Sequence, residues 1–315
     1  MTFKDPVEFG VCKMDQQSEI EHPMVSVIIP TFRRRSKLER CLESLLTSEY
    51  KSMEIIVIND SPDDDIQALK ERFDIRLIQH EVSIYVVASR NEGARLAKGR
   101  ILFFLDDDNI VNEKTVGLLV GKYSETTEIG VLGPLMFNLD GKVWFHGSRA
   151  NWILPDPRPI PISQLNYELI ETDVVPNAYM ISKQLFFEVG MEDPDMFPTH
   201  EELDLVQRVK RYGLRSYIYS KATLKHDYGN LALHLRNPYR LYIIVKCNIL
   251  IEAKYAPKSR LMLFKWIYVP CHALFYLFFF IPFKLDRSKL RAYYLNYMRG
   301  LFDGLKIAGR IRIND

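Results

Sequence analysis

The sequence predicts an α/β protein: a single domain with a mostly parallel central sheet flanked by helices, followed by a C-terminal helical region. Three observations predict this class. Apolar, β-branched runs alternate with helical patterns from residue 24 to residue 110. Hydrophobic residues make up 47% of the 315 residues, which is enough for a sizeable core. Beyond residue 233 the composition becomes basic, aromatic and helical in pattern.

The first half of the predicted domain, residues 24–110, alternates most clearly. Short runs such as "MVSVIIP" are typical of buried strands, whereas "RRSKLERCLESLLTS" spaces its apolar residues as a helix does. This alternation predicts a mostly parallel sheet with both faces covered. The expected order is strand 24–30, helix 34–48, strand 53–60, helix 65–73, strand 75–80, helix 86–99 and strand 100–108.

The second half of the domain, residues 111–233, is less regular. Residues 130–175 are rich in Pro and aromatic side chains, and we expect an irregular functional loop there. Beyond it, the pattern predicts a strand leading into a helix over 179–190, a helix over 201–213 and a strand within 215–226. Residues 1–23 look like a loose leader without a secretion signal.

The C-terminal region, residues 234–315, carries 15 Lys or Arg side chains against 4 Asp or Glu, so it suits an anionic partner. Its segment 266–283 has no charged side chain but is short for a spanning helix, which needs roughly 20 apolar residues. Helices lying in the membrane interface, a spanning helix or re-entrant hairpin, and a buried core helix are the alternatives. The mixture of basic and apolar residues suits a membrane surface, here through residues 236–315, better than nucleic acid.

Polar residues follow three of the predicted strands, at Pro30, Asp60 and Asp108. The carboxyl ends of parallel strands meet at one edge of a sheet, where ligands bind. The stretch "LFFLDDDN" places three carboxylates there, and a divalent cation would cancel their repulsion. The alternative is a helix cap. The four cysteines are scattered, which disfavours a zinc site or a disulfide framework.

Taken together, these motifs resemble family 2 of the inverting glycosyltransferases, which have the A-type nucleotide-sugar-binding fold. The resemblance covers roughly residues 25–230, because five motifs occur in the family's order. The C-terminal region looks like the membrane-proximal end of bacterial and archaeal members that glycosylate lipid-linked acceptors. The motifs are "VSVIIPTFRR", "MEIIVINDSPDDD", "ASRNEGARLAKGRILFFLDDDN", "EELDLVQRVKRYG" and "ATLKHDYG".

The resemblance implies a site for a nucleotide-sugar donor and a divalent metal, Mn²⁺ or Mg²⁺. Asn59 departs from the usual acidic pair, so the contact with the base passes to Asp60. Arg90 is expected near the phosphates of the nucleotide. The residues implied to bind the donor are Pro30, Thr31, Arg33, Asp60, Arg90, Asp106 and Asp107, and those implied to bind the metal are Asp106, Asp108 and His226.

The catalytic base is implied by the family pattern Glu-Asp-x-Asp, which here is Glu201-Glu202-Leu203-Asp204. Glu202 stands where the catalytic Asp is expected, and Glu201 is the alternative. Asp204 is expected to support the helix or the acceptor. A base at hydrogen-bond distance from an acceptor hydroxyl is what a single displacement requires.

The implied function is a metal-dependent inverting transfer of a sugar from a nucleotide-diphosphate sugar to a hydroxyl of a lipid-linked or nascent glycan acceptor. The expected location is the cytoplasmic face of the cell membrane, as a peripheral or monotopic protein. A polyprenyl-phosphate sugar synthase, whose phosphate acceptor needs no base, is one alternative. A sugar nucleotidyltransferase is another, although "PTFRRRSK" lacks the glycines of its phosphate loop.

Overall fold

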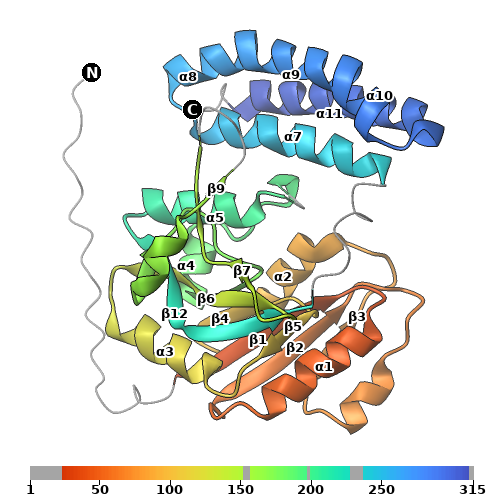
Figure 1. The fold of residues 1–315 in the computed structure, drawn as a ribbon. Helices are drawn as coiled ribbons and strands as arrows, with labels where there is room; N and C mark the ends of the chain where they lie inside the picture. The colour runs from red at the N-terminus through yellow and green to blue at the C-terminus, as the bar shows by residue number, and fades with distance from the viewer. Residues whose placement is uncertain (1–22, 152–156, 197–198, 228–236, 312–315) are drawn as a thin grey trace.

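The computed structural model describes residues 23–151, 157–196, 199–227 and 237–311. All but the last residue of the predicted leader, 1–23, lies outside the described residues. The protein is built in layers, with a central sheet, helices on both of its faces and a further helical layer at the C-terminus (Figure 1). The α/β class predicted from the sequence is confirmed.

The first half of the sheet is parallel, as predicted. Its spatial order is β3-β2-β1-β4, and every adjacent pair is parallel. All of β1 and β4 is buried, because helices cover both faces of these central strands. The bounds are β1 (Val25–Thr31), β2 (Met53–Asn59), β3 (Arg76–Gln79) and β4 (Ile101–Leu105).

The second half of the sheet is mixed. Strand β11 (Ala178–Ser182) is antiparallel to β4 on one side and to β6 (Ile129–Asn138) on the other. Strand β12 (Arg215–His226) then runs parallel to β6. Smaller strands complete this half: β5 (Asn109–Val111), β7 (Val143–Phe145), β8 (Ser148–Arg149), β9 (Arg158–Pro159) and β10 (Leu169–Glu171).

The expectation of an irregular stretch over residues 130–175 was therefore wrong at its start. Strand β6 is ten residues long, and its first eight residues are buried. Its two glycines and one proline made it look irregular in the sequence. A Cβ atom on Gly130 would collide with Val209, and one on Gly133 would lie 2.6 Å from Pro176. Close packing, not loop structure, requires those glycines.

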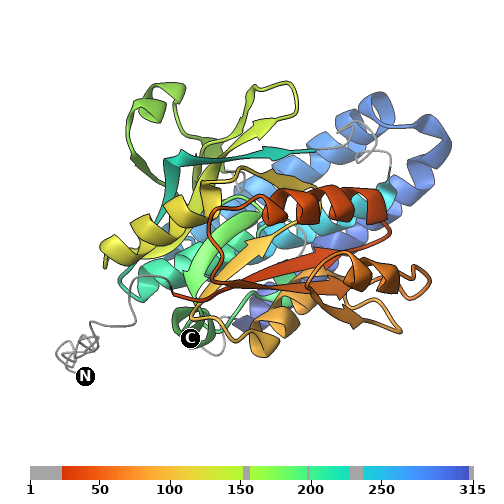
Figure 2. The ribbon, with the colours of Figure 1, turned by 90° about the horizontal axis from the view of Figure 1, so that it is seen from below.

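Helices cover both faces of the sheet (Figures 1 and 2), and each face has its own hydrophobic cluster. Helices α1 (Arg35–Leu46) and α3 (Thr115–Glu125) bury their apolar sides on one face. Helices α2 (Tyr85–Leu96), α4 (Lys183–Glu188) and α5 (Glu201–Arg211) lie on the other. The predicted helix over 65–73 is a short 3₁₀ turn, η1 (Gln67–Glu71); two others are η2 (Ile162–Asn166) and η3 (Pro194–Met196).

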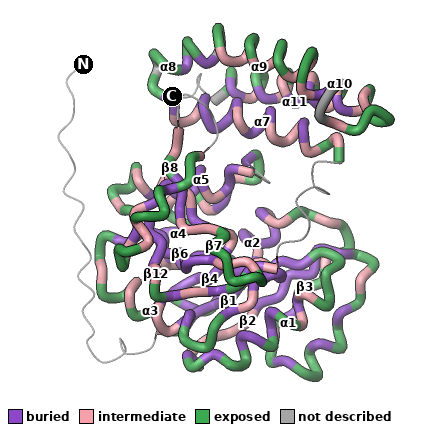
Figure 3. The backbone as a smooth tube through the Cα atoms, viewed as in Figure 1, coloured by how far each residue is buried: buried purple, intermediate pink, exposed green. Residues whose placement is uncertain are grey.

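The C-terminal layer packs beyond α5 and has its own hydrophobic cluster. Its outer helical run includes exposed residues, green in Figure 3, and several of them are large apolar ones. Over Ser259–Phe280 this run is the one helix within the described residues that is long and apolar enough to cross a membrane. The elements are α7 (Pro238–Tyr255), α8 (Lys258–Leu263), η4 (Phe264–Tyr268), α9 (Val269–Phe275), η5 (Tyr276–Phe280), α10 (Ile281–Lys284), η6 (Arg287–Lys289) and α11 (Leu290–Ile311).

Candidate active site

A cavity of about 340 Å³ opens at the carboxyl ends of β1, β2 and β4. The convergence of strand ends that the sequence predicted therefore forms a real depression in the molecule. Five of the seven residues predicted to bind the donor line it. The lining residues are Pro30, Thr31, Phe32, Arg34, Asp60, Ser83, Tyr85, Val86, Asp106 and Asp107.

Asp60 organises one wall of the cavity. Its carboxylate accepts hydrogen bonds from the Ser83 hydroxyl at 2.6 Å and from the backbone N–H groups of Ile84 and Tyr85, each at 2.8 Å. His80 lies 2.8 Å away on the same carboxylate. Burial alone would raise the pKa of Asp60, but these hydrogen bonds hold it below its usual value. Asp60 therefore stays charged and fixes the loop before α2.

Tyr85 is a cavity residue that the sequence did not indicate. It has a positive φ of 66°, which is strained for a residue with a side chain, and 63% of the residue is exposed. The hydrogen bond from its N–H to Asp60 holds this conformation. An exposed aromatic ring at the edge of a cavity, on a strained backbone that a hydrogen bond holds in place, is typical of a binding surface.

Asp107 closes the floor of the cavity. It is almost fully buried and accepts a hydrogen bond from the Thr31 hydroxyl at 2.7 Å. Burial raises its pKa to about 7, although the charge of Arg34 opposes this rise. The Thr31–Asp107 bond joins the ends of β1 and the β4 loop, so both residues hold the strand ends in register.

Two of the three predicted metal ligands are in contact. The Nε2 atom of His226 lies 3.1 Å from Asp108 Oδ1, at the end of β12. Asp106 instead pairs with Arg90 at 2.6 Å and accepts a hydrogen bond from Asn177 Nδ2 at 2.9 Å. Asn177 in turn lies 3.4 Å from His226, so it links the two halves of the set. Within the described ranges, no three His, Cys, Asp or Glu side chains are grouped to hold a metal ion.

Arg90, which the resemblance implied near the phosphates of the donor, does not line the cavity. Only 2% of its side chain is exposed, and it pairs with Asp106 at 2.6 Å, Glu192 at 3.0 Å and Glu202 at 3.4 Å. The Tyr179 hydroxyl also donates to Glu192, at 2.6 Å. Arg90 thus connects the acidic strand end of β4 to the first turn of α5. Nothing in the sequence pattern marked Glu192 as its main partner.

Glu202 lies at the first turn of α5 and faces Arg90. Its side chain is 15% exposed. Burial raises the pKa of Glu202 to about 7; the Arg90 charge lowers it, and the Glu192 charge raises it further. Glu201 is buried, and burial raises the pKa of its carboxyl well above the usual value. Glu202 is thus the more accessible carboxylate of the two.

Asp204 is fully buried and is bonded away from the cavity. It pairs with Arg208 on its own helix at 2.7 Å. Its carboxylate also accepts hydrogen bonds from two side chains of α7, Lys254 Nζ and the Tyr255 hydroxyl, each at 2.6 Å. Of the two roles predicted for Asp204, support of the helix or of the acceptor, these contacts fit the first, because the carboxylate fastens α5 to the C-terminal layer.

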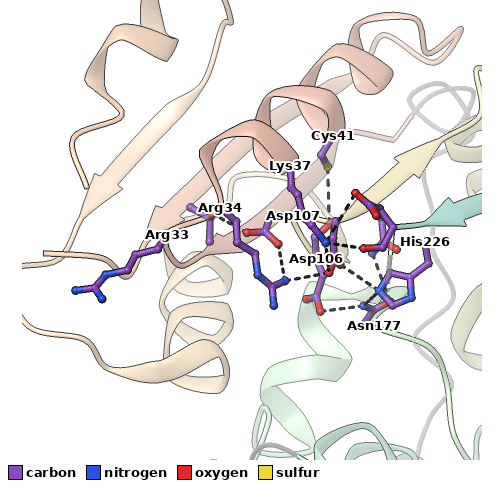
Figure 4. Close-up of polar contacts among 12 residues, drawn as sticks. Arg33, Arg34, Lys37, Cys41, Asp106, Asp107, Asn177 and His226 are labelled. Atoms are coloured by element: carbon purple, nitrogen blue, oxygen red, sulfur yellow. Dashed lines mark hydrogen bonds and ion pairs between the residues drawn. The ribbon is translucent and has the colours of Figure 1, made fainter. Parts of the chain in front are cut away.

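Arg33 points away from the acidic cluster, whereas Arg34 points toward it (Figure 4). Arg33 pairs with Asp63 at 2.6 Å, and both side chains are about 60% exposed at 59% and 62%. Arg33, which the resemblance implied as a donor-binding residue, therefore does not line the cavity, whereas its neighbour Arg34 does. Arg34 contacts Asp107 and Asp108 and lines the cavity.

A carboxylate-lined cavity at the strand ends of an α/β sheet lies where such sheets bind their ligands. The family model "Glycosyl transferase family 2" matches residues 26–188. The chain belongs to this family, and the resemblance inferred from its motifs is confirmed.

Curated relatives cover parts of the chain. GlyA, a glycosyltransferase of Streptococcus pneumoniae, is 30% identical over 128 residues, which are 39% of this chain and 18% of GlyA. The GalNAc(5)-diNAcBac-PP-undecaprenol beta-1,3-glucosyltransferase of Campylobacter jejuni is 30% identical over 109 residues, 33% of this chain and 35% of that protein. The chain thus matches about a third or less of the length of these two relatives.

Solved structures share the fold at low sequence identity. The mannosyltransferase PcManGT from Pyrobaculum calidifontis, in complex with GDP-Man and Mn²⁺, superposes with a TM-score of 0.57 at 14% identity, over 93% of this chain and 79% of that one. TarS 1–349 from S. aureus, in complex with UDP-GlcNAc, gives 0.58 at 15% identity over 88% and 81%. These likenesses establish the A-type glycosyltransferase fold.

Proposed function

We propose that this protein transfers a sugar, with inversion, from a nucleotide-diphosphate sugar to a hydroxyl of a lipid-linked or nascent glycan acceptor. One observation carries the proposal. The cavity at the strand ends and the largely buried carboxylate of Glu202, whose pKa burial raises to about 7, are joined through Arg90, which contacts both Asp106 and Glu202. Inverting transfer needs these two parts next to each other: a donor site and a base.

The donor's nucleotide would lie against Thr31, Asp60 and Tyr85, in the cavity at the ends of β1 and β2. An aromatic ring and a charged carboxylate at one wall suit a base and a ribose, which offer a flat face and hydrogen-bond donors. The remaining acidic wall, Asp106 and Asp107, would meet the phosphate end of the donor.

A divalent metal suits the Asp108–His226 pair. Carboxylate and imidazole are ligands of manganese, and the 3.1 Å separation of Asp108 Oδ1 and His226 Nε2 lets both face one ion. Magnesium and manganese sites of this class take one or two carboxylates and obtain further ligands from substrate phosphates. We therefore assign Asp108 and His226 as ligands, with Asp106 next to them. The metal would supply charge neutralisation for the leaving diphosphate.

Glu202 is the proposed base. At its raised pKa of about 7, the carboxylate can accept the proton of an acceptor hydroxyl near neutral pH. Arg90 holds the carboxylate at 3.4 Å and so orients it toward the β4 strand end, where the anomeric carbon would lie. Glu201, being buried, is the less suitable of the two.

The C-terminal layer is the proposed membrane surface, on the cytoplasmic side. Its outer helix exposes a row of large apolar side chains, while Phe264 and Ile281 on its other side are buried against the layer. A helix with one apolar face outward suits the membrane interface. The exposed side chains are Met262, Leu263, Trp266, Ile267, Leu274, Phe275, Phe278 and Phe279.

The function is tested by calorimetric titration with UDP, GDP and dTDP, each with and without Mn²⁺. We expect one nucleotide to bind tightly, and only with the metal. Asp108→Asn should abolish this metal-dependent binding. Asp63→Asn, which changes an exposed ion pair outside the cavity, should leave it unchanged. If no nucleotide binds to the folded protein, the proposal is wrong.

The membrane surface is tested by sedimentation with vesicles that contain anionic lipid. Trp266→Ser combined with Phe278→Ser and Phe279→Ser should leave the protein in the supernatant, because three exposed apolar anchors are lost. The control is Phe187→Ser, which removes an exposed aromatic side chain from α4. Unchanged sedimentation of the triple variant would contradict the assignment.

A further inference from the structure

Arg34 occupies a special place at the cavity. It is the last residue before α1, and its guanidinium group points at the acidic end of β4 (Figure 4). Nη1 lies 3.2 Å from Asp107 Oδ1 and 2.9 Å from Asp108 Oδ2. Its single positive charge therefore offsets part of the repulsion between two of the three adjacent carboxylates.

Arg34 contacts only one oxygen of each carboxylate, Asp107 and Asp108. The second oxygen of Asp107 accepts from Thr31, at 2.7 Å, and the second oxygen of Asp108 faces His226, at 3.1 Å. Both contacts of Arg34 use the same nitrogen, Nη1. A guanidinium group has five N–H donors in a planar fork, so most of its hydrogen-bonding capacity is unused by described residues. The side chain is 44% exposed and lines the cavity.

Among the described residues that line the cavity, Arg34 is the only Lys or Arg. Arg90 does not line the cavity; its side chain is 2% exposed and is paired with three carboxylates. Lys37 donates to the backbone carbonyl of Asp227 at 2.6 Å and lies 3.8 Å from Asp108 Oδ2, but it does not line the cavity either. An anion entering the cavity beside Asp106 and Asp107 therefore meets one positive side chain.

We propose that Arg34 binds the diphosphate of the donor and stabilises it as the leaving group. This inference rests on the proposed function and moves to Arg34 the phosphate contact that the sequence assigned to Arg90. Arginine suits the role because its fork matches two phosphoryl oxygens at once. The Asp107 and Asp108 contacts hold Nη1 in place, so the guanidinium is already oriented before the donor arrives.

The test compares a nucleoside diphosphate with its nucleoside. The affinities of wild type, Arg34→Gln and Arg34→Lys are measured by calorimetry for UDP, GDP and dTDP and for uridine, guanosine and thymidine, with Mn²⁺ present. We expect Arg34→Gln to lower the affinity for the diphosphate about 10- to 100-fold, because a charged hydrogen bond is lost. The affinity for the nucleoside should stay unchanged. Arg34→Lys should restore part of the loss, since it keeps the charge but not the fork.

Arg35→Gln is the matched control. Arg35 is the next residue, is similarly exposed at 48%, and pairs with Glu39 on its own helix at 3.1 Å. Its loss should change neither affinity. Circular dichroism melting checks that each variant folds.

Three results would contradict the inference or its basis. If Arg34→Gln binds the diphosphate as wild type does, Arg34 makes no phosphate contact. If Arg34→Gln weakens Mn²⁺ binding as much as it weakens diphosphate binding, Arg34 acts only by holding Asp107 and Asp108, and the inference is also wrong. If wild type binds no nucleotide, the proposed function itself fails, which the first two results leave intact.

Discussion

Replacing Arg90 by Met tests whether this buried cation holds the site together. Arg90 is 1% exposed and is the shared partner of Glu192, Asp106 and Glu202. Methionine fills much of the same volume but carries no charge, so three carboxylates lose their positive partner. Among the described residues, the carboxylate of Glu192 then keeps the hydrogen bond from the Tyr179 hydroxyl alone.

The expected cost follows from the burial of these groups. Removing one partner of a buried ion pair costs about 3–5 kcal/mol, because the remaining charge is uncompensated. Glu192 has a fully buried side chain, whereas the side chains of Glu202 and Asp106 are 15% and 25% exposed. Most of the cost should therefore come from Glu192. We expect Arg90→Met to lower the free energy of unfolding by about 3 kcal/mol at pH 8.

The measurement is urea denaturation at pH 8 and at pH 6. Burial already raises the pKa of Glu202 to about 7, and the loss of the Arg90 charge raises it further above its unfolded value. The penalty at Glu202 is then largest above this raised pKa and shrinks as the pH falls toward the unfolded one. Arg72→Met is the control, since Arg72 is 53% exposed and pairs with Glu43 on the surface; its loss should cost at most about 1 kcal/mol.

A loss below 1 kcal/mol for Arg90→Met at pH 8, or the same loss at both pH values, would refute this reasoning. Either result would mean that the carboxylates are neutral or hydrated without Arg90. Combining Arg90→Met with Glu192→Gln should recover part of the lost stability, because the most deeply buried charge is then removed as well.

Three further predictions concern single side chains. Glu202→Gln should keep nucleotide binding and slow transfer at least about 100-fold, and the wild-type rate should rise with pH through about 7, since the base must be deprotonated; a flat pH–rate profile would reject Glu202. Glu252, fully buried with both carboxylate oxygens unpaired among described residues, has a pKa that burial raises to about 8. The charged form of Glu252 destabilises the fold increasingly as the pH rises from the pKa of Glu252 in the unfolded chain to its folded pKa of about 8. In urea denaturation, Glu252→Gln should therefore stabilise the protein by several kcal/mol at pH 9 but by little at pH 5. Tyr255→Phe should cost about 1.5–3 kcal/mol in the same assay through its bond to Asp204, and equal stability would show that bond to be unimportant.

The parallel half of the fold could be predicted because its strands are continuous apolar runs. Strands β1 and β4 are buried throughout, so neither needs a polar face, and the helices between them carry regular apolar spacing. Strand β6 escaped prediction because glycines at 130 and 133 serve close packing against Val209 and Pro176. That packing depends on segments far apart in the sequence, which no local pattern contains.

The candidate site could be predicted where carboxylates follow directly on a strand that the sequence also predicts. Asp60, Asp106 and Asp107 line the cavity because strand ends meet there. Asn177 and Glu192 could not be found, since each acts through a side chain more than 70 residues away: Asn177 through Asp106, and Glu192 through Arg90. Buried polar partners of this kind are fixed by three-dimensional packing and leave no spacing signal.

The predicted boundary at residues 233 and 234 separates two parts that are closely bonded. Helix α7 reaches the first turns of α5 through Asn248, which lies 2.6 Å from His200, and through Lys254 and Tyr255 on Asp204. Glu202 lies between these two attachment points along the chain. If the C-terminal layer binds the membrane as proposed, the orientation of α5 relative to the bilayer is set by these three bonds. A lipid-linked acceptor would then approach the base from a fixed direction, so membrane attachment and the geometry of transfer belong to one rigid arrangement.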